Sequence, residues 1–306
     1  MAEIVVVGSL NQDLVVAVDR WPDSGETLTG LSLTRFAGGK GGNQAAAAAA
    51  LGGNVGLVGT VGDDEAGRWL RSSLSERGVD VSRVRTVHGL PTGTAVVGVE
   101  GSGANRIVVI PGANAAVGPA DVEGWDWAGT RVLLLQLEVP MDVVIAAARA
   151  GRAAGATVIL DPAPARPLPD ELWQHVDILV PNRHEAELLS GISVTDATAA
   201  RLAAARLARR GLRAVVLKLD AEGAVLVEGS YVAHVAGIVV HAIDSTAAGD
   251  AFGGALAVAL AEGRPLASGV VYANRAAAIS VTRPGAQASL PSRDEVDGLE
   301  PAGRTR

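Results

Sequence analysis

The stretch GGKGGNQAAAAAALGGNVGLV, residues 38–58, holds three features from which the architecture of this chain can be worked out. Four glycines surround Lys40, and the alanine-rich segment Gln44–Leu51 that follows predicts a closely packing helix. After a glycine pair, the apolar run Val55–Val58 predicts a short buried strand. A helix of small residues next to a fully apolar strand is typical of an α/β protein.

Segments of the same two kinds recur along the chain, and their alternation predicts the fold class. Apolar runs predict strands at Ile4–Val7, Val55–Val58, Val132–Leu135, Thr157–Leu160, Ile178–Val180 and Ala214–Leu217. Alanine-rich patterns predict helices at Gln44–Leu51, Glu65–Arg77, Met141–Ala154, Ala197–Arg210, Asp250–Ala261 and Ser268–Ser280. We expect an α/β fold with a mainly parallel central sheet and helices on both faces, and ligands beyond the carboxyl ends of the strands.

Two segments alternate polar and apolar residues instead, which predicts short antiparallel strands with one polar face. These strands are expected at Leu14–Val18, Leu28–Arg35, Thr94–Val99 and Arg106–Ile110, with a hairpin loop over residues 100–105. We expect them to form a small antiparallel β lid, made of about residues 12–36 and 92–111, on a single domain spanning residues 1–306. The tail from residue 300 onward is expected to fray.

Composition excludes several classes of protein. The 306 residues are 48% hydrophobic and 19% charged, which is enough apolar material for a large core. The net charge of −7 and the lack of a basic stripe argue against a nucleic-acid surface. Cysteine is absent, so disulfides and cysteine metal sites are excluded. No signal peptide and no membrane-length apolar run is evident, so we expect a cytoplasmic protein without membrane contact.

The glycine-rich loop around Lys40 looks like a phosphate loop but lacks the residues that define one. A Walker loop needs Ser or Thr after its lysine, where Gly41 stands. A dinucleotide fingerprint should follow the first strand, which continues instead into Gly8–Asp13. Two interpretations remain: a bend that lets the alanine helix pack closely, or a site for a polar or anionic ligand, with Lys40 nearby and Asn43 as the helix N-cap.

A second glycine-rich segment, DSTAAGDAFGG at residues 244–254, opens a predicted helix. The small residues Ala247, Ala248 and Gly249 let a ligand approach backbone amides that can form an anion hole. Asp250 could simply cap the helix or complement its dipole. A carboxylate within an anion hole would also suit a general base that takes a proton from an alcohol during phosphoryl transfer.

This segment is similar to the C-terminal signature of the ribokinase-like carbohydrate kinases, also called the PfkB family, and the loop Gly38–Asn43 is similar to their N-terminal signature. Further similar blocks follow in the family's order, so that the resemblance extends from about Ile4 to Leu290. These blocks are Gly8–Asp13, Leu135–Glu138, Asp161–Arg166, Pro181–Glu185 and Val281–Leu290.

The resemblance implies ATP-dependent phosphorylation of the primary 5-hydroxyl of D-ribose to give ribose 5-phosphate. A related acceptor (deoxyribose, another furanose sugar or a nucleoside) stays open, as does a non-catalytic sugar-binding protein. Asp250 would be the general base, and the amides of Ala247, Ala248, Gly249 and Asp250 the anion hole. An intact Asp250 argues against the non-catalytic alternative, and the scarcity of Phe and Tyr argues against a nucleoside.

The same resemblance assigns the binding residues. The sugar would be held by Asn11, Asp13, Gly39, Lys40, Gly41, Gly42, Asn43 and Glu138. Taken alone, Asp13 could be a turn residue and Glu138 a helix-start acid. Magnesium and phosphate would be positioned through Asn182 and Glu185, largely by way of water.

The nucleotide would lie along Lys218, Leu219, Asp220, Ala221, Glu222 and Gly223, with Asn274 near the base. Many family members have threonine in place of Lys218 and glycine in place of Asp220. We therefore expect Lys218 to meet phosphate and Asp220 to restrict the loop.

Two further expectations follow from the resemblance. Potassium would bind beside the anion hole at Asp244, Thr246, Ser280, Arg283, Gly285 and Ser289, mainly through oxygen atoms. Without the resemblance, the segment from Thr282 to Gly285 would be an ordinary turn. The lid would close over the sugar and pair with a second lid, which predicts a homodimer.

Overall fold

The computed structural model describes residues 2–101 and 105–299. The centre of the predicted hairpin loop and the tail predicted to fray lie outside these residues. No helix in the described ranges is both long enough and apolar enough to cross a bilayer.

The body of the molecule is built on a nine-stranded sheet that is parallel except at one edge. Its strands, in spatial order, are β13 (Tyr231–Ala236), β12 (Gly223–Glu228), β11 (Ala214–Lys218), β10 (Ile178–Leu179), β9 (Thr157–Leu160), β8 (Val132–Leu135), β1 (Ile4–Val7), β4 (Val55–Gly62) and β5 (Asp80–Val87). β12 pairs antiparallel with both β11 and β13, whereas the other pairings are parallel. The predicted α/β class with a mainly parallel sheet is confirmed.

The six strands predicted from apolar runs all lie in this sheet, and the three strands of the sheet that were not predicted are β5, β12 and β13. β5 and β13 are the outermost strands, and several of their side chains are exposed. An edge strand buries only part of its surface, so it lacks the continuous apolar run that marks the central strands.

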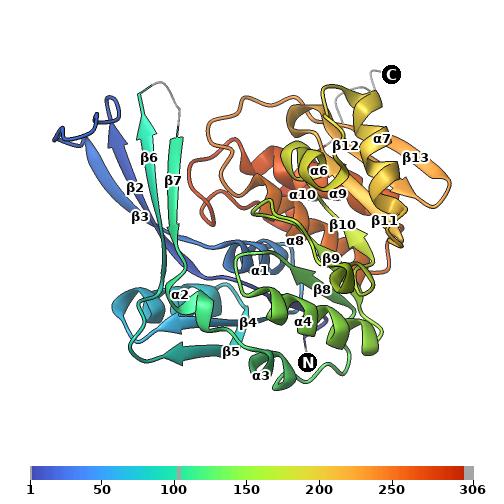
Figure 1. The fold of residues 1–306 in the computed structure, drawn as a ribbon, viewed down its shortest axis with the longest axis horizontal. Helices are drawn as coiled ribbons and strands as arrows, with labels where there is room; N and C mark the ends of the chain where they lie inside the picture. Colours follow the sequence, from blue (N-terminus) through green and yellow to red (C-terminus); the bar gives the residue numbers. More distant parts are fainter. Residues whose placement is uncertain (1, 102–104, 300–306) are drawn as a thin grey trace.

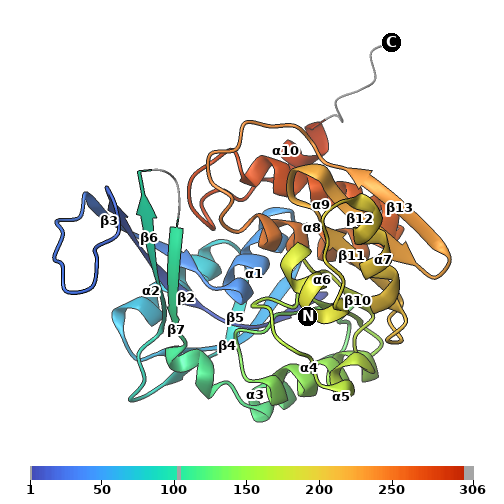
Figure 2. The same cartoon turned by 45° about the horizontal axis from the view of Figure 1, so that its top comes forward.

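Alternate side chains of each central strand enter two separate cores. Ile4 and Val6 of β1 point into one core, and Val5 and Val7 point into the other. Figure 2 shows the helices of the two layers on opposite sides of the sheet. One layer holds α1 (Lys40–Ala50), α2 (Glu65–Glu76), α8 (Ala248–Ala261), α9 (Leu266–Ser280) and α10 (Arg293–Gly298); the other holds α3 (Pro119–Glu123), α4 (Met141–Ala153), α5 (Asp170–Trp173), α6 (Arg183–Ser190) and α7 (Ala197–Ala208).

Close approach between α1 and α8 explains the run of alanines. A side chain added at Gly254 would lie 2.6 Å from the Ala47 methyl group and 2.8 Å from the Ala48 nitrogen. Only very small residues fit at such a contact, because each added methylene would force the two helices apart. The alanine helix of the sequence is therefore a packing requirement, and it brings the two glycine-rich segments together.

A second sheet projects from the body, as Figure 1 shows at the left. It contains β3 (Ser32–Gly38), β2 (Asn11–Val18), β6 (Gly93–Glu100) and β7 (Asn105–Ile110), in that order. The outer pairs are antiparallel as predicted, but the central pair, β2 with β6, is parallel. Parallel pairing arises because β2 and β6 both leave the body in the same direction.

Candidate active site

Four parallel strands deliver polar residues to one edge of the main sheet. β1 is followed by Ser9 and Asn11, β8 by Glu138, and β9 by Asp161, while β11 ends at Lys218. The carboxyl ends of parallel strands lie on the same side of a sheet, so these side chains converge. The two glycine-rich segments enter the same space at the N-termini of α1 and α8.

The glycines around Lys40 allow this loop to lie directly on the end of β1. Gly39 has a φ of 84°, and a side chain there would lie 2.6 Å from the Asn11 nitrogen. A side chain at Gly41 would lie 2.6 Å from the Gly8 carbonyl carbon. Helix α1 begins at Lys40 with Gly39 as its N-cap. The prediction that Asn43 caps the helix is therefore wrong, because left-handed Gly39 starts the helix earlier.

Asp250 lies in the first turn of α8 and is buried, with 5% of its surface exposed. Its Oδ2 accepts a hydrogen bond from Asn43 Nδ2 at 3.0 Å, and its Oδ1 accepts one from Gln44 Nε2 at 3.1 Å. Burial raises the pKa of Asp250 to about 6, against the lowering effect of Lys40. A carboxylate held by neutral amides and poised near neutral pH can accept a proton from an alcohol.

The turn that leads into Asp250 exposes backbone amides. Ala247 has a φ of 60° and is the N-cap of α8. The Ala248 amide donates to the Ser245 carbonyl oxygen at 3.2 Å. The backbone amides of Ala247, Gly249 and Asp250 donate no hydrogen bond within the described ranges. Three of the four amides predicted for an anion hole are thus available to a phosphate, while that of Ala248 bonds within its own turn.

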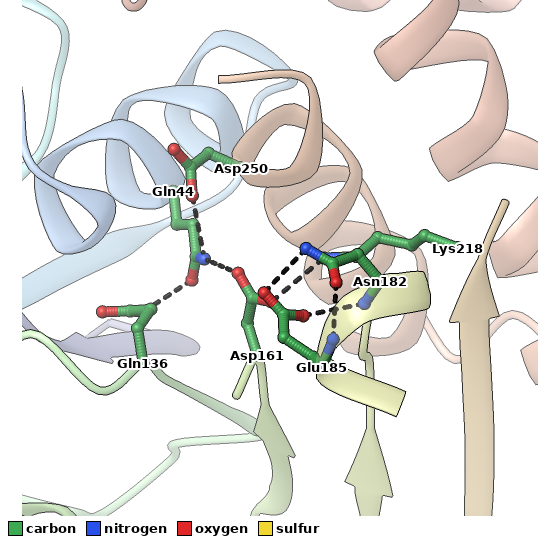
Figure 3. Close-up of polar contacts among 7 residues, drawn as sticks. All are labelled: Gln44, Gln136, Asp161, Asn182, Glu185, Lys218 and Asp250. Atoms are coloured by element: carbon green, nitrogen blue, oxygen red, sulfur yellow. Dashed lines mark hydrogen bonds and ion pairs between the residues drawn. The ribbon is translucent and has the colours of Figure 1, made fainter. Parts of the chain in front are cut away.

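A buried polar network behind Asp250 was not predicted from the sequence (Figure 3). Gln44 Nε2 also donates to Asp161 Oδ2 at 3.1 Å, and Gln44 Oε1 accepts from Gln136 Nε2 at 2.6 Å. Asp161 Oδ1 forms an ion pair of 3.0 Å with Lys218 Nζ. Nothing in the local pattern around Gln44 distinguishes it from the alanines that follow, so only its partners reveal its role.

Lys40 lies among carboxylates. Burial alone would lower its pKa, but Asp250, Asp161, Glu138 and Glu185 together raise the pKa above its ordinary value. The ammonium group therefore stays charged at neutral pH, and it offsets part of the negative charge gathered here.

The predicted sugar residues lie on the side of Asp250 that faces the lid. Ser9 Oγ donates to Glu138 Oε2 at 2.6 Å, and the Lys40 amide donates to the same oxygen at 3.2 Å. Asn11 Oδ1 accepts from Asn114 Nδ2 at 2.7 Å. Ser9 and Asn114 were not predicted, and they hold Glu138 and Asn11 in place. The result is a set of amides and carboxylates, which suits a ligand with several hydroxyl groups.

Asp13 has the most perturbed carboxyl group on this side. Its Oδ2 would lie 2.2 Å from a side chain added at Gly38, so Gly38 is what allows the carboxylate to sit against the backbone of β3. Burial raises the pKa of Asp13 to about 7, and the charges of Glu138 and Asp250 add to this effect.

The raised pKa of Asp13 predicts that this residue lowers the stability of the ligand-free protein above about pH 7. A pKa higher in the folded than in the unfolded chain means that Asp13 favours folding at acid pH, and this contribution is lost as the pH rises through about 7. Asp13→Asn should therefore raise the melting temperature of the ligand-free protein by a few degrees at about pH 8 and change it little at about pH 4. Thermal melts at both pH values test this; an equal change at both would contradict it.

A cavity of about 610 Å³ opens on the other side of Asp250. It extends from Lys40, Asp161 and Lys218 past Gly249 to Asn274. The loop residues at 237–240 form part of its wall, and most of its lining is apolar. Its position beside the amides of α8, and its size, suit a nucleotide whose phosphates point toward Asp250.

Not every residue predicted for the nucleotide reaches this cavity. Lys218, Asp220, Ala221, Gly223 and Asn274 line it. Leu219 is 1% exposed and packs in the core, and Glu222 forms an ion pair with Arg183 at 2.6 Å. The side chains of Leu219 and Glu222 thus serve the fold of the loop.

Asp220 has a φ of 52°, which is a left-handed conformation that favours glycine. The expected restriction by this aspartate is therefore a real backbone strain. Asp220→Gly should raise the free energy of unfolding by up to about 1 kcal/mol, reduced by the greater freedom of glycine in the unfolded chain. Urea denaturation measures the change. Asp220→Ala removes the same charge but keeps the strain, so it should not stabilise the protein.

Asn182 and Glu185 form a closed pair at the start of α6. Asn182 donates from its amide to Glu185 Oε2 at 2.7 Å and from Nδ2 to Oε1 at 2.8 Å, while the Glu185 amide donates to Asn182 Oδ1 at 2.8 Å. Each carboxylate oxygen of Glu185 thus accepts one hydrogen bond from Asn182 and keeps a lone pair for a metal or its water shell. Over the described ranges, no group of three or more His, Cys, Asp or Glu residues could hold a metal.

The positions predicted for potassium lie on two loops that meet beside the start of α8 and, for Ser280, at the last residue of α9. Asp244 Oδ1 accepts from the Thr246 amide at 2.9 Å and Oδ2 from the Gly285 amide at 2.8 Å. Ser280 and Ser289 are fully buried, and their hydroxyls donate to backbone carbonyls. Arg283 bonds Glu295 through its guanidinium, so only its backbone could face a cation. The donor set is rich in oxygen, as a monovalent cation requires.

Comparison with known proteins agrees with this geometry. The family model for pfkB family carbohydrate kinases matches residues 1–293. The ribokinase of Haemophilus influenzae is 39% identical over 294 residues, covering 95% of this chain and 96% of that protein. The deoxyribokinase of Salmonella typhi is 34% identical over 296 residues, covering 96% and 97%. A solved structure of Arabidopsis thaliana ribokinase complexed with ribose and ATP aligns with a TM-score of 0.90 and 35% identity, covering 96% of this chain and 97% of that one.

The chain belongs to the pfkB family of carbohydrate kinases. It is therefore a phosphotransferase, and the predicted family is confirmed.

Proposed function

We propose that this chain is an ATP-dependent ribokinase, which transfers the terminal phosphoryl group of ATP to the 5-hydroxyl of D-ribose. The observation that carries the proposal is Asp250, a buried carboxylate held by two neutral amides between a hydroxyl-binding side and a nucleotide-sized cavity. Ribokinases of bacterial and plant origin are its relatives at 35–39% identity, which supports ribose as the acceptor.

In the proposed mechanism, Asp250 takes the proton from the sugar hydroxyl as the hydroxyl oxygen attacks the terminal phosphorus of ATP. The bond between that phosphorus and the bridging oxygen breaks, and ADP leaves. The amides of Gly249 and Asp250 stabilise the charge on the transferred group. Asn11, Asp13 and Glu138 hold the sugar so that its hydroxyl lies against Asp250.

Two cations complete the proposal. The site gathers Asp13, Glu138, Asp161, Glu185 and Asp250 around two lysines, so a nucleotide needs additional positive charge. Magnesium would enter with ATP and meet Asn182 and Glu185 through water. Potassium would bind at Asp244 and neighbouring carbonyl oxygens and order the turn before Ala247. A cytoplasmic location follows from the cosubstrate, since ATP is a nucleotide of the cell interior.

A substrate panel tests the function. Ribose, deoxyribose, fructose and nucleosides are each supplied with ATP and magnesium, in potassium and in sodium, and ADP release is measured. We expect the highest kcat/KM with ribose, and higher activity in potassium than in sodium. Equal activity in the two salts would contradict the potassium site, and no turnover of any sugar would contradict the kinase.

Deoxyribose is the second candidate acceptor, because a deoxyribokinase is also similar over nearly the whole chain. Ribose differs from deoxyribose by one hydroxyl at C2. A site that hydrogen-bonds this hydroxyl would reject deoxyribose strongly, because buried polar groups would lose their partner. A deoxyribose kcat/KM within a few-fold of that of ribose would show that no such contact exists.

We also propose that the lids of two chains pair to form a homodimer. β3 and β7 are the edges of the lid sheet as far as the chain is described, and Leu33 and Val108 are 68% and 62% exposed. Exposed apolar edge strands are a liability unless they are covered. Leu33→Lys should convert a micromolar dimer to a monomer in sedimentation velocity, whereas Leu202→Lys on α7 should leave the dimer intact. A monomeric unmodified protein would contradict the proposal.

A further inference from the structure

Lysine occurs at two positions only, Lys40 and Lys218. All the other members of the total of 26 Lys and Arg residues are arginines. Both lysines line the cavity beside Asp250, although they are 178 residues apart in the sequence. Lysine carries a compact, strongly hydrated point charge, whereas arginine is a planar fork suited to bidentate ion pairs. Restriction of lysine to one cavity points to a requirement for that point charge at both positions.

Lys218 lies where a phosphate would pass. It ends β11, its side chain is 14% exposed, and its Nζ lies 3.4 Å from the position of a methyl group added at Gly249. The ammonium group therefore faces the first turn of α8. In this turn the backbone amides of Gly249 and Asp250 donate no hydrogen bond to the described part of the chain. Amides and an ammonium group that converge on one point form a binding site for a phosphoryl oxygen.

A continuous row of polar contacts joins Lys218 to Asp250 (Figure 3). Lys218 donates to Asp161, Gln44 donates to Asp161, and the same Gln44 nitrogen donates to Asp250. The distances are 3.0, 3.1 and 3.1 Å. Asp161 is 5% exposed and Gln44 is fully buried, so the row is shielded from water.

The chemistry of each position in this row is fixed by its neighbours. Asp161 faces a donor on both sides, so it must offer two acceptors, which a carboxylate does and an asparagine does not. Gln44 faces a carboxylate on both sides through one nitrogen, so it must offer two hydrogens there. Gln136 donates to Gln44 Oε1 and so holds the amide in this orientation.

We propose that Lys218 binds the phosphoryl group being transferred, and that Asp161 and Gln44 act as positioning residues that hold its ammonium group at a fixed place relative to the Asp250 carboxylate. The base and the phosphate-binding cation act on opposite sides of the transferred group. Their relative placement therefore sets the geometry of the transfer. This inference rests on the proposed kinase reaction, but it requires no particular sugar.

Lysine labelled with ¹³C at Cε tests the binding step without turnover, because the sequence allows only two such signals. The signal that disappears in Lys218→Arg belongs to Lys218. We expect this signal to shift when a magnesium complex of a non-hydrolysable ATP analogue is added, and to stay in place when ribose alone is added. A shift at Lys40 only would overturn the proposal, whatever the sugar proves to be.

Kinetics test the positioning step, with whichever acceptor the substrate panel identifies. Lys218→Met should lower kcat by about 10²-fold, and Lys218→Arg should recover part of the loss. Arg213→Met, which removes an ion pair at the opposite end of β11, should leave kcat unchanged. Gln44→Met should also lower kcat, and Lys218→Met should cost less in that background. If the double variant loses kcat by the full product of the two single losses, Asp161 and Gln44 do not position Lys218.

Discussion

Replacing Asp250 with asparagine should lower kcat by about 10²- to 10⁴-fold, because the reaction loses its proton acceptor. Ribose and ATP should still bind within a few-fold of their original affinities, since Asp250 is one contact among many in the site. Isothermal titration measures the binding, and coupled ADP release measures the rate. A fall in kcat of less than tenfold would show that another group takes the proton.

The pH dependence gives an independent check on the same residue. Burial raises the pKa of Asp250 to about 6, and only the ionised carboxylate can accept a proton. The value of kcat/KM should therefore fall about tenfold for each pH unit below about 6. This acid limb should vanish in Asp250→Asn. The first-turn acid of α4 supplies a matched control, because Asp142→Asn also removes a helix-start charge but lies outside the site.

The residues of the site differ in how far the sequence alone could reveal them. Asp250 and Lys40 stand in glycine-rich segments, which made a ligand site one of the interpretations, and the family resemblance decided in its favour. Gln44 follows directly after such a segment and looks like the first residue of an alanine helix. Its partner Asp250 is 206 positions away, and a contact of that kind leaves no local pattern.

The central strands and the outer strands show the same contrast for the fold. A central strand such as β8 is buried on both faces, so its sequence is an unbroken apolar run and its bounds were predicted without error. β13 has a mostly exposed or half-buried surface, and His234 interrupts its sequence, so that it lacks an unbroken apolar run. Prediction succeeded for the central parallel strands and failed for the partly exposed edge strands β5 and β13, while β12 was missed although it is buried except at Glu228.

Replacing Lys40 with methionine should lower kcat by about 10²-fold, because the site loses a cation that can stabilise the transferred phosphoryl group. The same change should move the acid limb of kcat/KM to higher pH. The sign follows from the charges: Lys40 lowers the pKa of Asp250, so its removal lets burial and the nearby Asp161 raise that pKa further. Asp250 then stays protonated up to a higher pH.

Lys40→Arg separates the effect of charge from that of shape. Arginine keeps the positive charge, so the acid limb should stay near that of the original protein. Its longer planar group cannot place the charge where the compact ammonium group lies among Asp250, Asp161 and Glu138, so kcat should still fall. An acid limb that stays in place in Lys40→Met would show that the ammonium group does not act on Asp250, and that its effect on the rate comes from contact with phosphate alone.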